Sequence, residues 1–378
     1  MKKILFLATL AIITFASCGS QDGKTLSGLD PQNFVGECDG DSTALFVLKN
    51  EAGMEVCITN YGGRIVSVMV PDKDGDMKDV VLGFDNIKDY IANPGMDFGA
   101  SIGRYANRIN KGQFTIGDEL IQLPTNNYGH TLHGGPRGWQ SKVYKANQIS
   151  DTQLELTIDS PDGDQNFPGH VIAVVTYTLT EDNAIDIDFK ATTDKETIIN
   201  MTNHCYFNLN GDGRKPITDN ILYINATKFT PVDSTFMTTG AIVDVFETPF
   251  DFNTPTAIGK RIDNQDSEQL RNGHGYDHNW VLNTNKDVKT IAATVESPTT
   301  GIILDVYTDQ PGLQVYTGNF LDGTVTCKGG IAYEQRTAIC LEPQVYPDSP
   351  NKRNFPSPYL TPGKTYSAKI VYKFSVKK

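Results

Sequence analysis

Hydrophobic and polar residues alternate along much of the chain with a period of two residues. The alternation is clear in the segments 153–159, 171–180, 184–193 and 366–376, where apolar residues recur at every second position. This pattern is typical of β-strands that bury one face. Stretches rich in Gly, Asp, Asn and Pro separate the alternating segments and indicate turns.

Helical periodicity is scarce, and only the segment 86–95 (NIKDYIANPG) suggests one or two helical turns. Many evenly spaced strands with few helices predict an all-β fold, either a large antiparallel β-sandwich or a barrel. The chain shows no repeat of fixed period and no linker near its middle. We therefore expect one large β domain.

The segment 197–211 (TIINMTNHCYFNLNG) predicts a strand with an unusual polar face. One face carries mainly apolar side chains, and the other carries Asn200, Thr202, His204, Tyr206 and Asn208. An exposed strand face would be expected to contain Lys and Glu instead. Uncharged hydrogen-bonding groups around a histidine indicate either a binding surface or a buried polar layer.

The N-terminus has the features of an export signal. The basic MKK precedes an apolar run too short for a comfortable membrane span, and small residues lead to Cys18. This predicts a lipoprotein-type signal at residues 1–18 that ends at a lipidated Cys18, a polar tether at 19–33 and the domain at 34–378. Ordinary secretion is the alternative. Either reading places the protein in the bacterial cell envelope, as a membrane-anchored lipoprotein or a periplasmic protein.

Charge and cysteine content exclude several classes of function. The formal net charge is −12 and no basic block occurs, which argues against binding nucleic acid and against electrostatic binding to membranes. The cysteines after Cys18 are five, scattered and without a CxxC pair. A disulfide framework and a zinc cluster are therefore not expected.

Metal-ligand spacing is present but lies in an unfavourable context. His130 and His133 are three residues apart, and His274 and His278 are four apart, but both pairs lie in Gly-rich irregular sequence instead of a helix. The segment 72–76 (DKDGD) starts like a calcium loop and lacks the distal Glu, so a charged hairpin turn is expected. We therefore predict no metal ion in the functional site of the protein. An accessory calcium ion bound elsewhere is left as an alternative.

Two residues are candidates for acid–base catalysis. Glu342 ends an apolar strand just before a Pro-rich turn, where partial burial would raise the pKa of its carboxyl. His204 has hydrogen-bonding neighbours that could fix its tautomer. Taken alone, His204 is better explained as an ordinary buried histidine, and Glu342 fits a surface carboxylate equally well.

The chain resembles the aldose 1-epimerases, also called galactose mutarotases, from about Asn60 to the C-terminus. The shared motifs occur in the family's order: NYGGRIVSVMVPDKDG, VVLGFD, IGRYANRINKGQF, HTLHGG, PDGDQNFPG, TNHCYFNLNG, GYDHNW, QPGLQVYTGNF and CLEPQVYPDSPN. The resemblance implies a single-domain antiparallel β-sandwich, the galactose mutarotase-like supersandwich, with a broad cleft for a pyranose. It also implies interconversion of the α and β anomers of aldohexoses such as galactose and glucose.

The resemblance assigns roles to particular residues. His204 would be the general acid and Glu342 the general base of ring opening and reclosure. The residues expected to bind sugar hydroxyls are Asn107, Arg108, His133, Asp277 and Gln314. The chemistry moves only protons, so no cofactor is expected. The expected partner is a monosaccharide, and the expected state is a monomer or a weak dimer.

Three other functions compete with this one. A hexose-6-phosphate 1-epimerase would need a cationic cluster, for which Arg108, Arg104 and Arg137 are the candidates. A noncatalytic carbohydrate-binding lipoprotein would have no reason to retain both His204 and Glu342. A glycosidase would need a second acidic group placed by motif, and only Glu342 is so placed.

Overall fold

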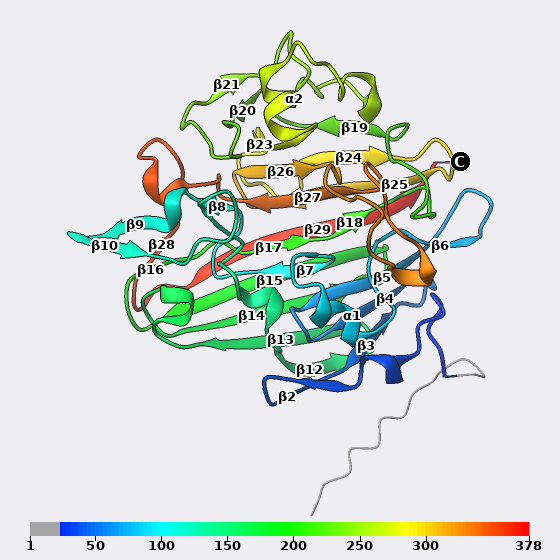
Figure 1. Cartoon of the computed structure of the whole chain (residues 1–378). Helices are drawn as coiled ribbons and strands as arrows, with labels where there is room; N and C mark the ends of the chain where they lie inside the picture. Colours follow the sequence, from blue (N-terminus) through cyan, green and yellow to red (C-terminus); the bar gives the residue numbers. More distant parts are fainter. Residues whose placement is uncertain (1–22, 378) are drawn as a thin grey trace, which may run out of the picture.

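A computed structural model describes residues 23–377, and the predicted signal segment with Cys18 lies outside them. Antiparallel β-strands dominate the described residues, which confirms the predicted all-β class (Figure 1). Helix α1 (Ile87–Ala92) lies where helical turns were expected, and α2 (Glu268–Gly273) was not predicted. Among these residues no helix has the length and hydropathy of a membrane span.

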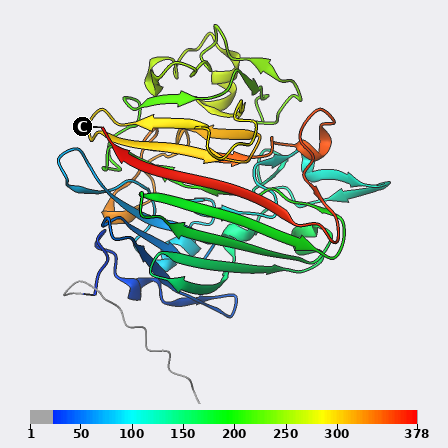
Figure 2. The same cartoon turned by 180° about the vertical axis from the view of Figure 1, so that it is seen from behind.

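The largest sheet has nine strands and forms the rear layer of the molecule (Figure 2). Its side chains alternate between buried and partly exposed, as in Val171–Leu179, which confirms the period of two seen in the sequence. In spatial order its strands are β12 (Lys145–Ser150), β13 (Gln153–Ser160), β14 (Val171–Leu179), β15 (Ala184–Thr193), β29 (Tyr366–Val376), β25 (Ile302–Thr308), β24 (Ala293–Glu296), β19 (Ile221–Ile224) and β22 (Thr256–Ala257).

Two smaller sheets lie in front of it (Figure 1). The six-stranded sheet has the order β18 (Tyr206–Phe207), β27 (Ile339–Gln344), β26 (Gly312–Tyr316), β23 (Asp277–Val281), β20 (Lys228–Thr230) and β21 (Val243–Asp244). The four-stranded sheet has the order β3 (Leu45–Lys49), β4 (Glu55–Thr59), β5 (Arg64–Pro71) and β6 (Met77–Asp79).

One hydrophobic cluster joins the rear and front layers. Ile187 and Ile370 of the nine-stranded sheet, Leu341 of the six-stranded sheet and Val56 of the four-stranded sheet all belong to it and are fully buried. The Tyr372 hydroxyl of β29 also donates a hydrogen bond of 2.7 Å to the Leu341 carbonyl. Burial of this apolar surface from both layers is the main force that holds the sandwich together.

Short two-stranded sheets and 3-10 helices complete the fold. The strand pairs are β1 (Gly36–Cys38) with β2 (Asp41–Thr43), β7 (Ala100–Ile102) with β17 (Thr202–His204), β8 (Arg108–Ile109) with β11 (Thr131–Leu132), β9 (Gln113–Ile116) with β10 (Glu119–Gln122), and β16 (Thr197–Ile198) with β28 (Tyr359–Leu360). The 3-10 helices are η1 (Pro31–Phe34), η2 (Asn110–Gly112), η3 (Trp139–Ser141), η4 (Asp164–Asn166), η5 (Ile258–Lys260), η6 (Lys328–Gly330) and η7 (Ser349–Asn351).

The strand expected over 197–211 is not continuous but is divided among β16, β17 and β18. At the breaks, hydrogen bonds from buried asparagine side chains take the place of some backbone hydrogen bonds between strands. The Asn200 amide donates to the Ala106 carbonyl at 3.1 Å and accepts from the Val345 N–H at 3.1 Å. These bonds join three loops across the front of the molecule. Part of the polar face noted in the sequence is therefore structural.

The described part of the predicted tether lies against the domain. The Leu26 N–H donates to the Glu55 carboxylate, at 2.6 Å, and the Ser27 hydroxyl donates to that of Ser67 at 3.0 Å. Leu29 is buried. This segment therefore packs on the four-stranded sheet from Leu26 onward, which a polar composition alone does not predict.

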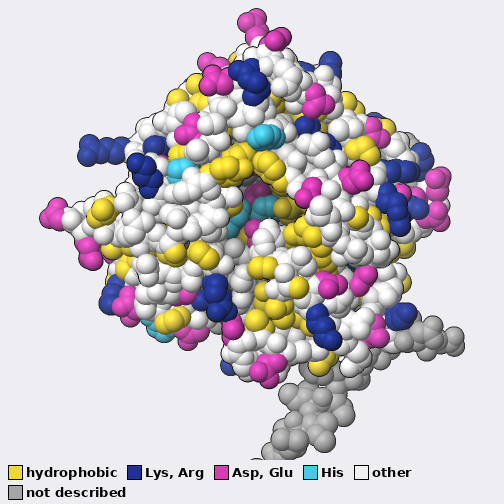
Figure 3. All heavy atoms as spheres, viewed as in Figure 1, with side chains coloured by type: hydrophobic (Ala, Val, Ile, Leu, Met, Phe, Trp, Pro, Cys, Tyr) yellow, Lys and Arg dark blue, Asp and Glu magenta, His cyan; other side chains and the backbone are white. Residues whose placement is uncertain are grey.

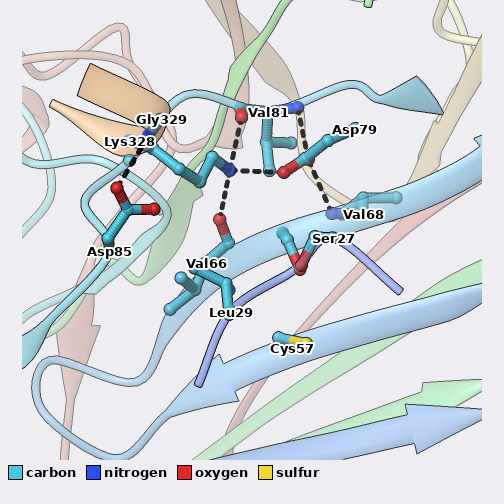
Figure 4. A network of polar contacts seen from close by, with 12 residues as sticks. Ser27, Leu29, Cys57, Val66, Val68, Asp79, Val81, Asp85, Lys328 and Gly329 are labelled. Atoms are coloured by element: carbon cyan, nitrogen blue, oxygen red, sulfur yellow. Dashed lines mark hydrogen bonds and ion pairs between the residues drawn. The ribbon is translucent and has the colours of Figure 1, made fainter. Parts of the chain in front are cut away.

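A partly buried lysine, Lys328, connects the segment between β26 and β27 to the four-stranded sheet (Figure 4). The Lys328 ammonium donates to the carbonyls of Val66 and Val81 at 2.7 and 2.8 Å and forms an ion pair of 2.7 Å with Asp79. The other Asp79 oxygen accepts from the Val68 N–H at 3.1 Å. Lys328 thus donates hydrogen bonds to two backbone carbonyls and neutralises the charge of a carboxylate. These contacts link two segments that are distant in sequence.

Candidate active site

A hollow opens at the centre of the front face, with histidine and acidic side chains at its floor and hydrophobic side chains around it (Figure 3). All seven residues predicted from the sequence line this one cleft: Asn107, Arg108, His133, His204, Asp277, Gln314 and Glu342. They come from β8 and the loop before it, from β17, β23, β26 and β27, and from the loop after β11. The fold therefore brings together residues that are far apart in the sequence.

Three of these side chains lie side by side because their strands are neighbours. Glu342 of β27 is paired in register with Gln314 of β26, and β26 pairs with β23, which carries Asp277. The Gln314 amide donates a hydrogen bond of 2.7 Å to the Asp277 carboxylate. The paired strands thus present a carboxylate, an amide and a second carboxylate on one sheet face.

His204 projects from the short strand β17 toward Glu342. Its Nε2 lies 3.5 Å from the Glu342 Oε1, and both side chains are buried. The imidazole stacks on the Tyr206 ring, with 5.0 Å between centroids, and meets the His133 ring edge to face at 5.1 Å. This packing fixes the plane of the His204 ring beside the carboxylate.

Burial opposes charge on both members of the pair. It lowers the pKa of the His204 imidazole to about 4. It also raises the pKa of the Glu342 carboxyl well above its usual value, and the nearby carboxylates of Asp277 and Asp97 raise it further. The two opposite shifts therefore favour a pair that carries one proton in total and has no net charge.

The tautomer of His133 is set by the backbone. Its Nδ1 accepts a hydrogen bond of 3.1 Å from the Asn107 N–H. Burial, with the adjacent His204 and Arg108, lowers the pKa of His133 well below its usual value, so the ring is neutral. A neutral ring whose Nδ1 accepts must carry its proton on Nε2. His133 therefore offers one N–H donor beside the acid–base pair.

The same tautomer bears on metal binding. The ligand-type atoms of His133, His204 and Glu342 lie within 4.8 Å of one another, as in a three-residue metal site. With its proton on Nε2, His133 has no free lone pair on that atom for a metal ion. Binding a metal would require breaking the hydrogen bond from Asn107. In this arrangement His133, His204 and Glu342 are better suited to forming hydrogen bonds than to binding a metal ion.

The Arg108 side chain is held in place by its neighbours, and its guanidinium still has unused N–H donors. Its Nε donates to the Asn127 amide oxygen at 3.1 Å, and its guanidinium carbon lies 4.7 Å from the centroid of the Phe236 ring. The Asn107 side chain accepts from the Arg108 N–H at 2.8 Å. The Nη groups donate to no described residue and are available to a ligand in the cleft.

Asn107 and His133 have a backbone conformation that few residues other than glycine adopt. Their φ angles are +65° and +50°, in the left-handed region. Asparagine tolerates this region better than most residues, whereas histidine adopts it at a cost of the order of 1 kcal/mol. Strain of this kind often accompanies functional loops, and here it is found in two residues that contact each other.

The histidine pairs and the acidic turn singled out in the sequence do not converge on common sites. His130 accepts from the Lys111 N–H through Nδ1 and contacts the Thr235 hydroxyl through Nε2. His274 ends helix α2, and His278 is buried behind the sheet. In the segment 72–76, Asp72 accepts from two backbone N–H groups, as expected for a charged hairpin turn.

Several cleft residues were missed by the sequence analysis. Tyr206, Tyr316 and Phe320 supply aromatic walls, and Asp97 supplies a third carboxylate. Tyr206 shares the alternating polar face with His204, so a signal for it was present. Asp97 lies in a loop that carried no distinguishing pattern.

The chain was compared with known proteins. Residues 44–373 match the family model described as aldose 1-epimerase. Galactose mutarotase of Rattus norvegicus is 40% identical over 337 residues, which cover 89% of this chain and 95% of that protein. Aldose 1-epimerase of Escherichia coli K12 is 38% identical over 338 residues, which cover 89% and 96%.

Solved structures agree with the sequence relatives. The structure of a GalM/aldose epimerase homologue from C. elegans superposes with a TM-score of 0.82 at 30% identity, covering 89% of this chain and 100% of that one. The structure of galactose 1-epimerase from Lactobacillus acidophilus gives a TM-score of 0.80 at 30% identity, covering 91% and 97%. The chain therefore belongs to the aldose 1-epimerase family.

Proposed function

We propose that the protein is an aldose 1-epimerase, an isomerase that interconverts the α and β anomers of aldohexoses such as galactose and glucose. The observation that carries the proposal is the buried contact between His204 and Glu342 in a cleft lined by hydrogen-bonding groups. The names of the relatives support the same reaction.

The chemistry follows from what each residue can do. Opening a cyclic hemiacetal requires the hydroxyl on C1 to lose a proton while the ring oxygen gains one. Glu342 takes the C1 hydroxyl proton, and protonated His204 delivers a proton to the ring oxygen as the C1–O5 bond breaks. Concerted transfer avoids both a free alkoxide and a free oxocarbenium ion. Rotation about C1–C2 followed by reclosure, with the two roles reversed, gives the other anomer.

The electrostatics of the pair suit this exchange. Before ring opening the pair is charged, with Glu342 as carboxylate and His204 as imidazolium, and after ring opening both are neutral. Burial raises the free energy of the charged arrangement relative to the neutral one, as the opposite pKa shifts of the two groups indicate. Proton transfer to the sugar therefore returns the pair from the charged to the more stable neutral arrangement, which favours ring opening once the charged arrangement has formed.

The other predicted residues would orient the sugar. Arg108 and His133 supply N–H donors, and Asp277 supplies an acceptor whose position is fixed by Gln314. Asn107 acts mainly on its neighbours, because its amide oxygen and its N–H already bind Arg108 and His133. These groups would also retain the open-chain aldehyde until it recloses.

The reaction needs no cofactor, since it transfers only protons and neither oxidises nor reduces the sugar. An accessory calcium ion outside the cleft is compatible with this chemistry and would have a structural role only. The active protein is expected to be a monomer or a weak dimer.

A hexose 6-phosphate is a poorer substrate for this cleft. Arg108 is the one Lys or Arg among the described residues that line it. The Arg104 guanidinium donates to the Pro168 and Gly169 carbonyls, both at 2.9 Å, and Arg137 pairs with Asp39 on the surface. The cations that would favour a phosphate are therefore engaged elsewhere.

A noncatalytic sugar-binding function is also disfavoured. Sugar binding alone would be served by Arg108, His133, Asp277 and Gln314. It gives no reason to bury a histidine against a carboxylate at 3.5 Å, because an unsatisfied buried pair destabilises the fold. The pair is readily explained by proton transfer.

We further propose that the protein acts in the cell envelope as a lipoprotein anchored through Cys18. The support is the apolar run that ends in small residues before Cys18. The domain would then meet sugars that arrive from outside the cell.

Polarimetry tests the proposed function directly. Freshly dissolved α-galactose or α-glucose should approach its equilibrium rotation faster with the purified protein, lacking residues 1–18, than without it. The rate should persist after treatment with a chelator. A wild-type protein that does not exceed the spontaneous rate would contradict the proposal, and a rate lost to chelation and restored by one metal would contradict the metal-free mechanism.

A further inference from the structure

Asp97 is a carboxylate in the cleft that neither the acid–base pair nor the predicted sugar-binding set uses. It lies in the loop between α1 and β7 and lines the cleft together with Phe98 and Tyr206. The loop is fixed from behind, because the Arg64 Nη1 donates to the carbonyls of Met96 and Phe98, both at 3.0 Å. The backbone on each side of Asp97 is thus anchored to a buried arginine.

The carboxylate of Asp97 accepts no hydrogen bond from any described residue; its Oδ1 is inaccessible to solvent, so Oδ2 is the oxygen that a ligand in the cleft can reach. Structural aspartates elsewhere in the chain differ in this respect. Asp72 and Asp79 each accept from backbone N–H groups, which explains their positions. An acceptor that is buried without a donor destabilises the fold unless another molecule supplies the donor.

Electrostatics agree with the geometry. Burial raises the pKa of Asp97 to about 6, against the opposing effect of the Arg64 charge. At pH 7.5 the group is therefore mainly ionised. Because the His204–Glu342 pair shares one proton and has no net charge, Asp97 and Asp277 leave two carboxylates against the single cation Arg108 among the described residues of the cleft. An anionic ligand would be repelled by this arrangement.

We propose that Asp97 determines substrate specificity by accepting a hydrogen bond from a hydroxyl of the bound sugar and by excluding sugars that carry a negative charge. This inference rests on the proposed epimerase function and deepens it, because it names uncharged aldoses as the substrate class and sugar phosphates and uronic acids as the excluded class. Aldehyde-forming chemistry at C1 does not by itself distinguish these classes, so the selection must come from the cleft wall.

The test compares Asp97→Asn with the wild-type protein in the complete chain. The kcat/KM for mutarotation is measured by polarimetry at pH 7.5 with glucose, glucose 6-phosphate and glucuronate. Loss of a charged acceptor should lower kcat/KM for glucose by about tenfold. The ratio of the glucose value to either anionic value should also fall by about tenfold. Asp244→Asn, which removes one exposed carboxylate from β21, is the matched control and should leave the ratio unchanged.

Thermal unfolding separates this role from a structural one. Because the Asp97 carboxylate satisfies no described N–H group, Asp97→Asn should not lower Tm. A ratio within twofold of the wild-type value, an unchanged kcat/KM for glucose or a clear loss of Tm would each overturn the inference. If the wild-type protein fails to accelerate mutarotation of any sugar, the epimerase function itself has failed. An active wild type with an unchanged ratio refutes only the role of Asp97.

Discussion

The His204 Nε2 and the Glu342 Oε1 lie 3.5 Å apart, and both side chains are buried at the floor of the cleft. The two residues come from strands in different sheets, β17 and β27. Because burial disfavours a charge on either group, the contact is most stable when the pair carries one proton in total. Ring opening and ring closure move that proton between the two residues by way of the sugar.

The pair predicts an unusual pH profile. A second proton, which would protonate Glu342 and His204 together, binds only near pH 4, because the pKa of His204 is lowered to about that value. Loss of the one shared proton occurs as pH rises through the raised pKa of Glu342. Because Asp97 itself titrates near pH 6, the profile is followed in Asp97→Asn, whose kcat/KM we expect to hold at pH 5.5 and to fall near pH 4 on the acid side.

This profile is measured by polarimetry after subtraction of the spontaneous rate at each pH. An acid limb with its midpoint near 6.5, the usual pKa of an exposed histidine, would contradict the proposed electrostatics. It would mean that His204 titrates as if it were in contact with solvent.

Removal of His204 should resemble removal of Glu342. His204→Gln keeps a polar side chain and removes the proton donor, so kcat should fall by about 10²-fold or more. The variant with both His204→Gln and Glu342→Gln should lose far less than the product of the two single effects, because acid and base serve one concerted step. Losses that multiply independently would indicate separate roles.

The Lys328 contact predicts a stability effect away from the cleft. Lys328→Met leaves the Asp79 carboxylate without its cation and two carbonyls without their donor. The free energy of unfolding should fall by about 3 kcal/mol. Lys364→Met, at an exposed site, should change it by less than about 0.5 kcal/mol. Denaturant titration of both variants checks this, and equal effects would show that the Lys328 network adds little.

The envelope proposal is tested at Cys18. If this residue carries the lipid, Cys18→Ala should shift the protein from the membrane fraction to the soluble fraction or leave the signal uncleaved. Fractionation and the mass of the mature N-terminus distinguish these outcomes. Normal maturation with unchanged membrane association would rule out a lipid anchor at this position.

The sequence predicted the fold class well because alternation along β14 and β15 directly reflects one buried face. It did not predict the breaks within 197–211. There, the side chain of Asn200 bonds to loops distant in sequence, and no local pattern encodes those partners. The hydrogen bond from the Leu26 N–H to Glu55 and the burial of Leu29 were missed for the same reason.

The candidate site was predicted from motifs, and the fold places those residues around one cleft. Motifs could not show the pairing of Gln314 with Asp277 or the tautomer of His133, because both depend on contacts between separate segments. Asp97 was not predicted as a site residue, because an aspartate in a polar loop is normally exposed. Its place in the cleft wall and the Arg64 bonds to the carbonyls of Met96 and Phe98 are visible only in the folded chain.

The central claim is that Glu342 is the base that removes the anomeric proton. Glu342→Gln keeps the shape and a hydrogen-bonding group and removes the basicity. Binding should change little, because the proposed sugar-binding residues Arg108, His133 and Asp277 would be unchanged. Titration of the variant with galactose, followed by NMR, measures this affinity.

The most direct measurement is therefore the polarimetric rate of galactose mutarotation by Glu342→Gln, with enough sugar to saturate both proteins. General acid–base catalysis contributes about 10²–10⁴-fold, so we expect kcat to fall by at least about 10²-fold while galactose still binds. A variant that retains near-normal mutarotation, or one that no longer binds galactose, would contradict the role of Glu342 as the base.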